Sequence, residues 1–383
     1  MITIANADKA LKTYYLDAIS AQLDSISPFY AAIDKHSAEV YGKEVKVAVV
    51  KGDNSRVVAG AEDGDLPAAG QNRYINLTST LKNIYGTIEI SDKALRAAKN
   101  SEGAFVDLVN AEMEGLISSA KVNFSRMLYG DGNGFIATIT ETGDNGIKVN
   151  NIGRLSEGMH VDLRSGSGVM SGGEDVVVSD VNYSTGYIKF ATEIEGVLAG
   201  KSLYVHGAYG NEITGFKALF GTEDIYGLSR TGESFLTPAT FESSTLTVAL
   251  ISEKISYLEE YFNNRPNMII CSYKTRAKIA EMLAETRMQV STSVLNGGYS
   301  AVMFDDIPVV ADRYCEDDSL YIINTNDFCI AQLCDWAWLE DEDGKILKQV
   351  PGKAAYSATL VKYAELICKK PCAQGVIVGF SLT

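Results

Sequence analysis

The sequence has no long hydrophobic run. Across its 383 residues, no stretch of roughly 18 apolar residues occurs, which is about the length that a membrane-spanning helix needs. The first residues, from Met1 to Asp8, lack the basic and then apolar pattern of a secretory signal peptide. The sequence therefore predicts no membrane span and no secretion. Its hydrophobic content of 46% is ordinary for a folded globular chain.

Basic residues are also scarce. Lysine and arginine number 34 against 49 aspartate and glutamate residues, so the formal net charge is −15. A chain with this charge repels nucleic acid at long range unless its charges are segregated onto separate faces. The sequence therefore argues against a dedicated DNA-binding protein, although it is compatible with a protein that only encloses DNA.

Histidine is rare, and catalytic motifs are missing. The three histidines, His36, His160 and His206, fall in different segments, and no G-x-S-x-G nucleophile elbow accompanies them. The glycine-rich string at 130–134 superficially resembles a phosphate loop, but it lacks the GKS or GKT ending and follows a predicted helix. We therefore predict no catalytic residue, no cofactor-binding residue and no enzymatic activity.

A metal-binding spacing of cysteines is missing too. With no signal peptide, reduced thiols are the default, and we interpret the cysteines as small buried hydrophobic residues. The acidic stretch at 340–344 is interpreted as a solvated turn closed by Asp-Gly, with a weak cation site at a subunit contact as the alternative. No metal ligand is predicted, because the six cysteines are too widely spaced for a CxxC zinc knuckle: Cys271, Cys315, Cys329, Cys334, Cys368 and Cys372.

Alternating hydrophobic residues predict an extended arm. Valines alternate over 45–49, and a returning strand is centred on Ile75. A charged, glycine-rich stretch at 52–70 joins the two strands. Two strands alone do not bury a hydrophobic core, so we expect this arm to lie on a neighbouring subunit.

Helical and β-rich segments alternate along the rest of the chain. Ser27-Pro28 is expected to end the first helix, and Thr237-Pro238 is expected to open the third. Short β-rich runs between glycine turns at 135–210 predict a small β-barrel or sandwich inserted into the main fold. The last third is again β-rich. Helical periodicity predicts four helices, at about 7–23, 101–129, 238–262 and 274–283.

Four short sequence stretches are informative when they are taken together in their order along the chain. The tip of the arm contains EDGDLP at 62–67, and the arm is followed by ISDKAL at 90–95. The long predicted helix ends in LYGDG at 128–132, and FDDIPVV at 304–310 forms a later strand. In this order the stretches resemble the Hong Kong 97-type major capsid proteins of tailed bacteriophages. One departure is Asp306, where that family often has glycine.

The resemblance implies an α+β fold with the parts of that family. These parts are an N-arm, an extended loop, a peripheral domain with a long spine helix, and an axial domain, here with the inserted β-domain. Their implied ranges are 1–42 for the N-arm, 43–81 for the extended loop, 82–134 and 349–383 for the peripheral domain, 135–210 for the inserted domain and 211–348 for the axial domain.

The resemblance also implies a function. The chain would assemble with itself into pentamers and hexamers of an icosahedral virion shell that encloses double-stranded DNA without reading its sequence. Assembly would take place in the bacterial host cytoplasm, with portal and scaffolding proteins, and in some phages a decoration protein, as partners. No membrane takes part.

The arm also supplies the candidate contact residues of the shell. We predict that Glu62, Asp63 and Asp65 at its tip, together with Lys51, contact a neighbouring subunit. Some family members join subunits covalently through a lysine and an asparagine with the help of a glutamate. Lys51 would supply the amine, but residues 349–362 contain neither asparagine nor glutamate, so we expect non-covalent contacts.

Two other functions remain open. An encapsulin-type nanocompartment shares this fold, but encapsulins usually lack a surface insertion, so the segment at 135–210 favours a virus. The second alternative is a phage surface or tail module whose β-insertion binds glycans. That alternative does not explain the long helix or the axial-type pattern.

Overall fold

The computed structural model describes residues 27–37, 39–54, 56–60, 62–63, 65–66, 68–93, 102–143, 146–194, 196, 199–285, 292–294, 300–341 and 344–382. The predicted helix at 7–23 and the predicted helix cap at Ser101 lie outside these residues. No helix in the described part is long and apolar enough to cross a membrane.

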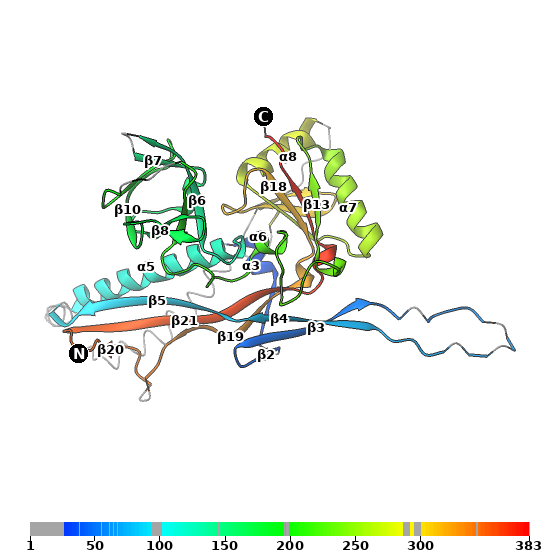
Figure 1. Cartoon of the computed structure of the whole chain (residues 1–383), viewed down its shortest axis with the longest axis horizontal. Helices are drawn as coiled ribbons and strands as arrows, with labels where there is room; N and C mark the ends of the chain where they lie inside the picture. Colours follow the sequence, from blue (N-terminus) through cyan, green and yellow to red (C-terminus); the bar gives the residue numbers. More distant parts are fainter. Residues whose placement is uncertain are drawn as a thin grey trace.

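A long central sheet runs along the molecule, with helix α5 (Glu102–Leu128) lying against it (Figure 1). Antiparallel pairing joins β5 (Lys82–Ser91) to β21 (Ala355–Cys368) over ten consecutive residue pairs. On its other edge β21 pairs with β19 (Phe328–Trp338) and with the short β20 (Lys348–Gln349). The first strand, β1 (Asp34–His36), adds to β19 in parallel.

The predicted long helix is confirmed by α5. Met113, Ile117, Phe124 and Leu128 recur at helical spacing and are buried, while the residues between them include one exposed glutamate and two exposed serines. Its 27 residues span about 40 Å at 1.5 Å per residue. The sheet beneath it presents every second residue of β5, such as Ile84 and Ile88.

A second sheet of seven strands has the order β13-β22-β18-β14-β17-β16-β15. Helices α7 (Val248–Phe262) and α8 (Tyr273–Glu285) pack on it around a separate hydrophobic cluster. The strands are β13 (Ala239–Glu242), β14 (Met268–Cys271), β15 (Thr292–Val294), β16 (Ser300–Phe304), β17 (Ile307–Ala311), β18 (Ser319–Ile323) and β22 (Gly375–Val378).

One predicted helix boundary is wrong. Pro238 does not open a helix, because the residues after it form β13 in parallel pairing with β22. The helix starts ten residues later, where the Thr247 hydroxyl caps α7 by accepting from the Leu250 amide.

Ser27 and Pro28, expected to end the helix at 7–23, also begin helix α3 (Pro28–Ala32). The Ser27 hydroxyl accepts from the Tyr30 amide, and proline suits a first helical turn. The end of the preceding helix lies outside the described residues.

The turn between β16 and β17 explains how the chain tolerates Asp306 in place of glycine. Asp305 and Asp306 have φ values of 49° and 62°, and they connect the paired residues Phe304 and Ile307. Positive φ at both central residues is the signature of a type I′ hairpin turn. Aspartate adopts this conformation more readily than most side chains, so the hairpin is retained.

A third sheet, also of seven strands, is formed by residues 135–205 and stands above α5 in Figure 1. It has its own hydrophobic cluster, which includes Ile136, Leu163 and Leu203. Its strands are β6 (Phe135–Gly143), β7 (Gly146–Val149), β8 (His160–Ser165), β9 (Gly168–Val169), β10 (Val176–Asn182), β11 (Tyr187–Phe190) and β12 (Ser202–Val205).

The predicted arm consists of β3 (Glu44–Gly52) and β4 (Arg73–Thr80), with β2 (Val40–Tyr41) at its base. Figure 1 shows the hairpin leaving the body and projecting well beyond it. Contrary to the expectation, the base packs against its own chain: Val45, Val47 and Leu77 are buried in the largest hydrophobic cluster. Only the outer half projects away from the body.

Two strands pair in a different sheet from the one that their expected domain range implies. Strand β19 falls in the range expected for the axial domain, but it pairs with β21 in the central sheet. Strand β22 falls in the range expected for the peripheral domain, but it pairs with β18 and β13 in the second sheet. The chain thus passes between the central sheet and the second sheet more often than the domain ranges implied by the resemblance.

Candidate functional site

The outer half of the arm carries the predicted contact residues. Glu62, Asp63 and Asp65 are all exposed. Apolar side chains accompany them: Val57 and Leu66 are both 92% exposed. Isolated hydrophobic residues are normal on a protein surface, but this segment combines acids and apolar groups on a hairpin that projects from the body. The arrangement suits a contact with another chain.

Lys51 lies apart from the acidic tip. Its ammonium forms an ion pair with Glu233 of the same chain, just before the short helix at Ser234–Leu236. Both side chains are about one-third exposed, so the pair contributes little stability. The structure therefore assigns Lys51 a partner at the base of the arm, which sequence reasoning missed because Glu233 is 182 positions away.

An open cleft of about 770 Å³ lies beside this ion pair. Residues 50–53 of the arm form one wall, and α7 contributes Tyr257 and Tyr261 to another. Tyr261 is 66% exposed, and Lys370 adds a positive charge at the edge of the cleft. The cleft lies at the junction between the arm and helix α7, which packs on the second sheet.

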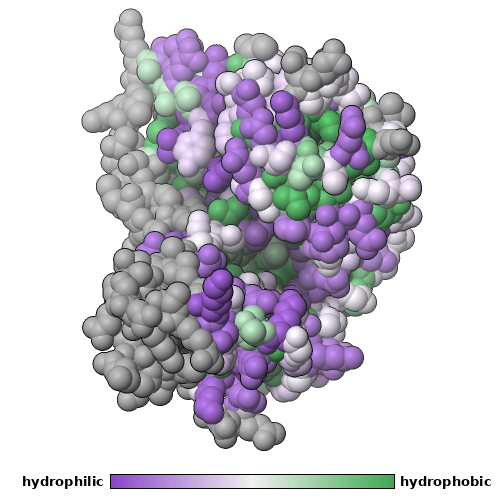
Figure 2. Space-filling model, turned by 90° about the vertical axis from the view of Figure 1, so that its left-hand side faces the viewer, coloured by the Kyte–Doolittle hydropathy of each residue, from purple (hydrophilic) through white to green (hydrophobic). Residues whose placement is uncertain are grey.

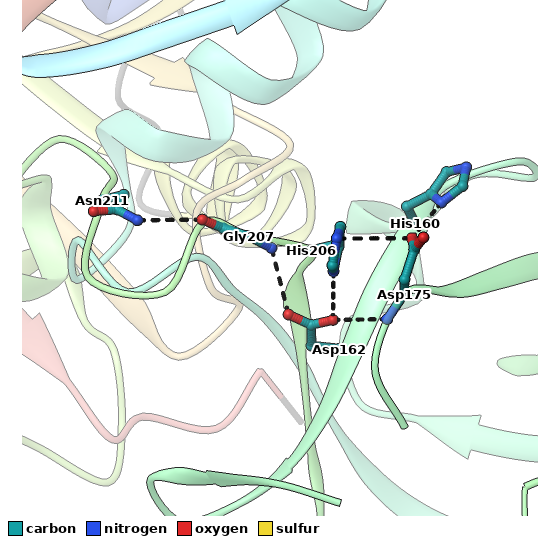
Figure 3. Close-up of polar contacts among 6 residues, drawn as sticks. All are labelled: His160, Asp162, Asp175, His206, Gly207 and Asn211. Carbon is teal, nitrogen blue, oxygen red and sulfur yellow. Dashed lines mark hydrogen bonds and ion pairs between the residues drawn. The ribbon is translucent and has the colours of Figure 1, made fainter. Parts of the chain in front are cut away.

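A cluster of two histidines and two aspartates lies where the chain leaves the third sheet (Figure 3). Strands β8 and β12 are paired, and this pairing brings His160 and His206 close together. The His206 Nδ1 atom lies 2.7 Å from Asp162 Oδ1, and His160 Nδ1 lies 2.6 Å from Asp175 Oδ1. His160 and His206 are 46 positions apart along the chain, and the pairing of β8 with β12 brings them together.

Asp162 is the centre of that cluster. Its carboxylate also accepts from the backbone amides of Asp175 at 2.9 Å and Gly207 at 3.4 Å. The hydrogen bond that the His206 imidazole donates to Asp162 raises the pKa of His206. Burial alone would raise the pKa of Asp162, but its hydrogen bonds more than offset burial and lower the pKa. Asp162 thus accepts hydrogen bonds from three donors. These bonds hold in place residues 206–207, where the chain leaves the third sheet.

Five of the six cysteines are buried, as predicted for small hydrophobic residues. Burial raises the pKa of Cys271 to about 12 and that of Cys329 to about 11. Burial also raises the pKa values of Cys315, Cys368 and Cys372. These five thiols are therefore weak nucleophiles at neutral pH.

Buried charges join the long helix to the segments beneath and beside it. Arg126 of α5 makes two hydrogen bonds to Glu212, and both side chains are almost completely buried. Lys362 of β21 donates to Gln332 at 2.7 Å and to Asp335 at 2.6 Å on β19. Such pairs are costly to break because one charge would remain buried alone. They therefore fix how α5, the central sheet and residues 206–215 fit together.

The acidic stretch at 340–344 forms a turn in the residues described. The Gly344 amide donates to the Asp341 carbonyl at 2.8 Å, and the Asp341 amide donates to the Lys345 carbonyl at 2.9 Å. Gly344 has a φ of 71°, which favours glycine. The predicted Asp-Gly turn agrees with this geometry, while the alternative of a cation site stays a hypothesis.

Figure 2 shows the end of the molecule opposite the arm tip. Hydrophilic residues predominate there, with scattered hydrophobic ones, and a recess runs at mid-height between the upper and lower parts. A cleft of about 320 Å³ lies between β5, α5 and residues 205–212. It is lined mainly by apolar groups such as Leu116 and Trp336.

Comparisons with known proteins bear on the fold. No protein family profile matches the sequence, and no curated protein is detectably similar to it. The capsid of cyanophage A-1(L) aligns with a TM-score of 0.56 at 11% identity, over 93% of each chain. This chain has the Hong Kong 97-type capsid fold.

Two further capsid-fold structures are similar over most of their lengths. The capsid of an empty GTA particle aligns with a TM-score of 0.52 at 11% identity, over 94% of this chain and 90% of its own. The holo-SrpI encapsulin complex of Synechococcus elongatus aligns with a TM-score of 0.48 at 11% identity. The two capsid alignments place the whole described body, and not one motif, in the capsid fold.

Proposed function

We propose that the chain is the major capsid protein of a tailed bacteriophage, a structural subunit that forms the icosahedral shell around double-stranded DNA. The observation that carries this proposal is the likeness to two capsid structures over at least 90% of each chain, with TM-scores of 0.56 and 0.52. The acidic net charge of −15 fits a wall that encloses DNA without binding it tightly.

The parts of the fold are then assigned as follows. The central sheet with α5 as spine helix is the peripheral domain, and the second sheet with α7 and α8 is the axial domain that gathers around the symmetry axes. The third sheet is an inserted domain. Support for insertion comes from its ends, which lie together: the Val205 amide donates to the Gly134 carbonyl at 2.9 Å, and the Glu212 amide to the Gly132 carbonyl at 3.2 Å.

The arm is the extended loop that joins neighbouring subunits within pentamers and hexamers. Its base is buried by its own chain, whereas its outer half is not. Glu62, Asp63 and Asp65 are assigned to the contact with the neighbour, and Lys51 orients the base of the loop through Glu233. The expected partners are other copies of the chain, a portal protein, a scaffolding protein and, on the outer surface, a decoration protein.

Electron microscopy of the full chain expressed alone in bacteria tests the proposal. Shells, tubes, pentamers or hexamers are expected, and a stable lone monomer would overturn it. After boiling in denaturant the particles should run as one band near 41.4 kDa, since non-covalent contacts hold the shell. Particles purified from infected cells should contain double-stranded DNA; a protein cargo in its place would indicate an encapsulin-type compartment instead.

A further inference from the structure

Three metal-ligand side chains from two distant parts of the sequence converge at the edge of the central sheet. His36 is the last residue of β1, Glu39 follows three positions later, and Cys329 lies on β19. A ligand atom of each residue lies within 4.8 Å of the other two. The His36 Nε2 atom is 3.7 Å from a carboxylate oxygen of Glu39. Parallel pairing of β1 with β19 brings the two segments together.

Two polar atoms at this point are shielded from solvent and make no hydrogen bond within the described part of the chain. They are Nδ1 of His36 and Oε2 of Glu39. A buried polar atom without a partner is destabilising, and most native structures avoid it. The third side chain, Cys329, is completely buried. The cluster therefore presents nitrogen, oxygen and sulfur atoms whose bonding capacity the described residues leave unused.

The ligand atoms of the cluster suit a divalent cation. Such an ion would neutralise the Glu39 carboxylate and a Cys329 thiolate together, because a thiol that coordinates a metal gives up its proton.

We propose that His36, Glu39 and Cys329 bind one zinc ion, with water as the fourth ligand. An imidazole nitrogen, a carboxylate oxygen and a thiolate sulfur are the ligand types of zinc, whereas magnesium and calcium prefer oxygen alone. On binding, the Cys329 Sγ–H bond breaks, an Sγ–Zn bond forms and the proton passes to water. A tetrahedral site needs ligand atoms roughly 3.4–3.8 Å apart, so the two partly exposed side chains have to close slightly around the ion.

The location gives this site a structural role. Among the described strands, β1 pairs with β19 only, and the chain turns into β2 at the base of the arm directly after Glu39. A metal bound to both β19 and the segment after β1 would fix the point from which the arm departs. The proposal does not depend on shell assembly, because the ligands all belong to one chain.

Metal analysis of the purified full chain tests this proposal. The protein is stripped with a chelator, incubated with zinc chloride, desalted and analysed for zinc per chain. We expect one zinc per chain for the natural sequence. Cys329→Ser and His36→Gln should each lower the zinc content at least tenfold. The matched control is Cys334→Ser, on the same strand but outside the cluster, which should retain the zinc.

Two further measurements keep the test decisive. Because Cys329 is fully buried, its variant is compared by thermal melting, and Glu39→Gln, at a partly exposed site, provides a second variant. Cobalt chloride is the second probe: a thiolate-to-cobalt absorption band should appear in the natural protein and in Cys334→Ser but not in Cys329→Ser. Zinc content below one-tenth per chain in the folded natural protein, or equal zinc in all variants, would overturn the proposal.

Discussion

The central sheet and the arm are both built on long antiparallel strand pairs, yet they bury their surfaces in different ways. Strand β21 is covered so completely that Lys362 and Glu365 are fully buried. In the arm, only the inward face near the body is buried, and beyond Gly52 the apolar Val57 and Leu66 face solvent. The first region is buried within one chain, whereas the proposed function assigns the cover of the second to another chain.

Deleting residues 53–70 should have the largest effect, and it should separate the roles of the two regions. The deletion removes the exposed half of the arm and leaves the buried valines of β3 in place. We expect folding to be spared and particle assembly to be lost, because intersubunit burial would disappear while the core stays intact. Sedimentation of the purified protein, together with its thermal melt, measures both. Normal shells of normal stability would contradict the intersubunit role of the arm.

Arg126→Ala should have the opposite effect, on folding more than on assembly. The substitution leaves the Glu212 carboxylate buried without its partner, and breaking such a pair costs about 3–5 kcal/mol. Urea denaturation of unassembled subunits measures the loss. The matched control is Lys148→Ala, which removes an exposed ion pair with Glu141 and should cost about 0–1 kcal/mol. Equal effects of the two substitutions would refute the special role of the buried pair.

Glu365 should make the stability of the body depend on pH. Burial raises its pKa from 4.5 to about 7, so the folded protein binds this proton more tightly than the unfolded chain. Between these pH values the folded state holds more protons, and its stability falls as pH rises, by up to about 1.4 kcal/mol per pH unit. Above pH 7 the loss is complete.

Glu365→Gln should remove that dependence. The amide oxygen of glutamine can still accept from the Thr214 and Leu366 amides, which lie 2.7 Å and 3.1 Å from the Glu365 carboxylate. The stability of the variant relative to the natural protein should therefore increase from pH 5 to pH 8. Denaturant melts across this range test it, with Glu253→Gln at an exposed site as control. A constant difference between variant and natural protein would refute the role assigned to Glu365.

Local patterns predicted much of the fold. Helix α5 and strand β3 follow from periodicity, because each buries one side at a spacing that the sequence displays. The start of α7 was missed because Pro238 is a good first helical residue in isolation, whereas pairing of β13 with β22, across more than 130 residues, decided the conformation there. Such pairing depends on the whole fold.

Contacts between residues far apart in the sequence also limited the prediction of the candidate sites. Lys51 meets Glu233 only through the packing of the arm on a segment 182 positions away, and His160 meets His206 through the register of β8 with β12. The cysteine spacing gave no indication of a mixed ligand set, because Cys329 lies beside His36 and Glu39 only through the parallel pairing of β1 with β19. A ligand set divided between residues 36 and 329 has no local signature.

The smallest expected effect concerns the acids at the arm tip. Glu62, Asp63 and Asp65 are exposed and are proposed to face a neighbour. One exposed pair contributes about 0–1 kcal/mol and weakens with salt, but a shell repeats the contact at every subunit. The variant Glu62→Gln/Asp63→Asn/Asp65→Asn should therefore fold normally and raise the protein concentration needed for assembly by a few-fold at low salt.

Varying the salt concentration provides a control for the role of the acids at the arm tip. Because screening weakens exposed ion pairs, the difference between the triple variant and the natural protein should shrink as ionic strength rises. Light scattering against protein concentration, at low and high salt, measures it. A matched variant, Glu141→Gln/Glu157→Gln/Asp180→Asn, removes three exposed acids from the third sheet and should assemble like the natural protein. If both variants changed assembly equally, net charge would be the cause and the arm tip would have no specific role.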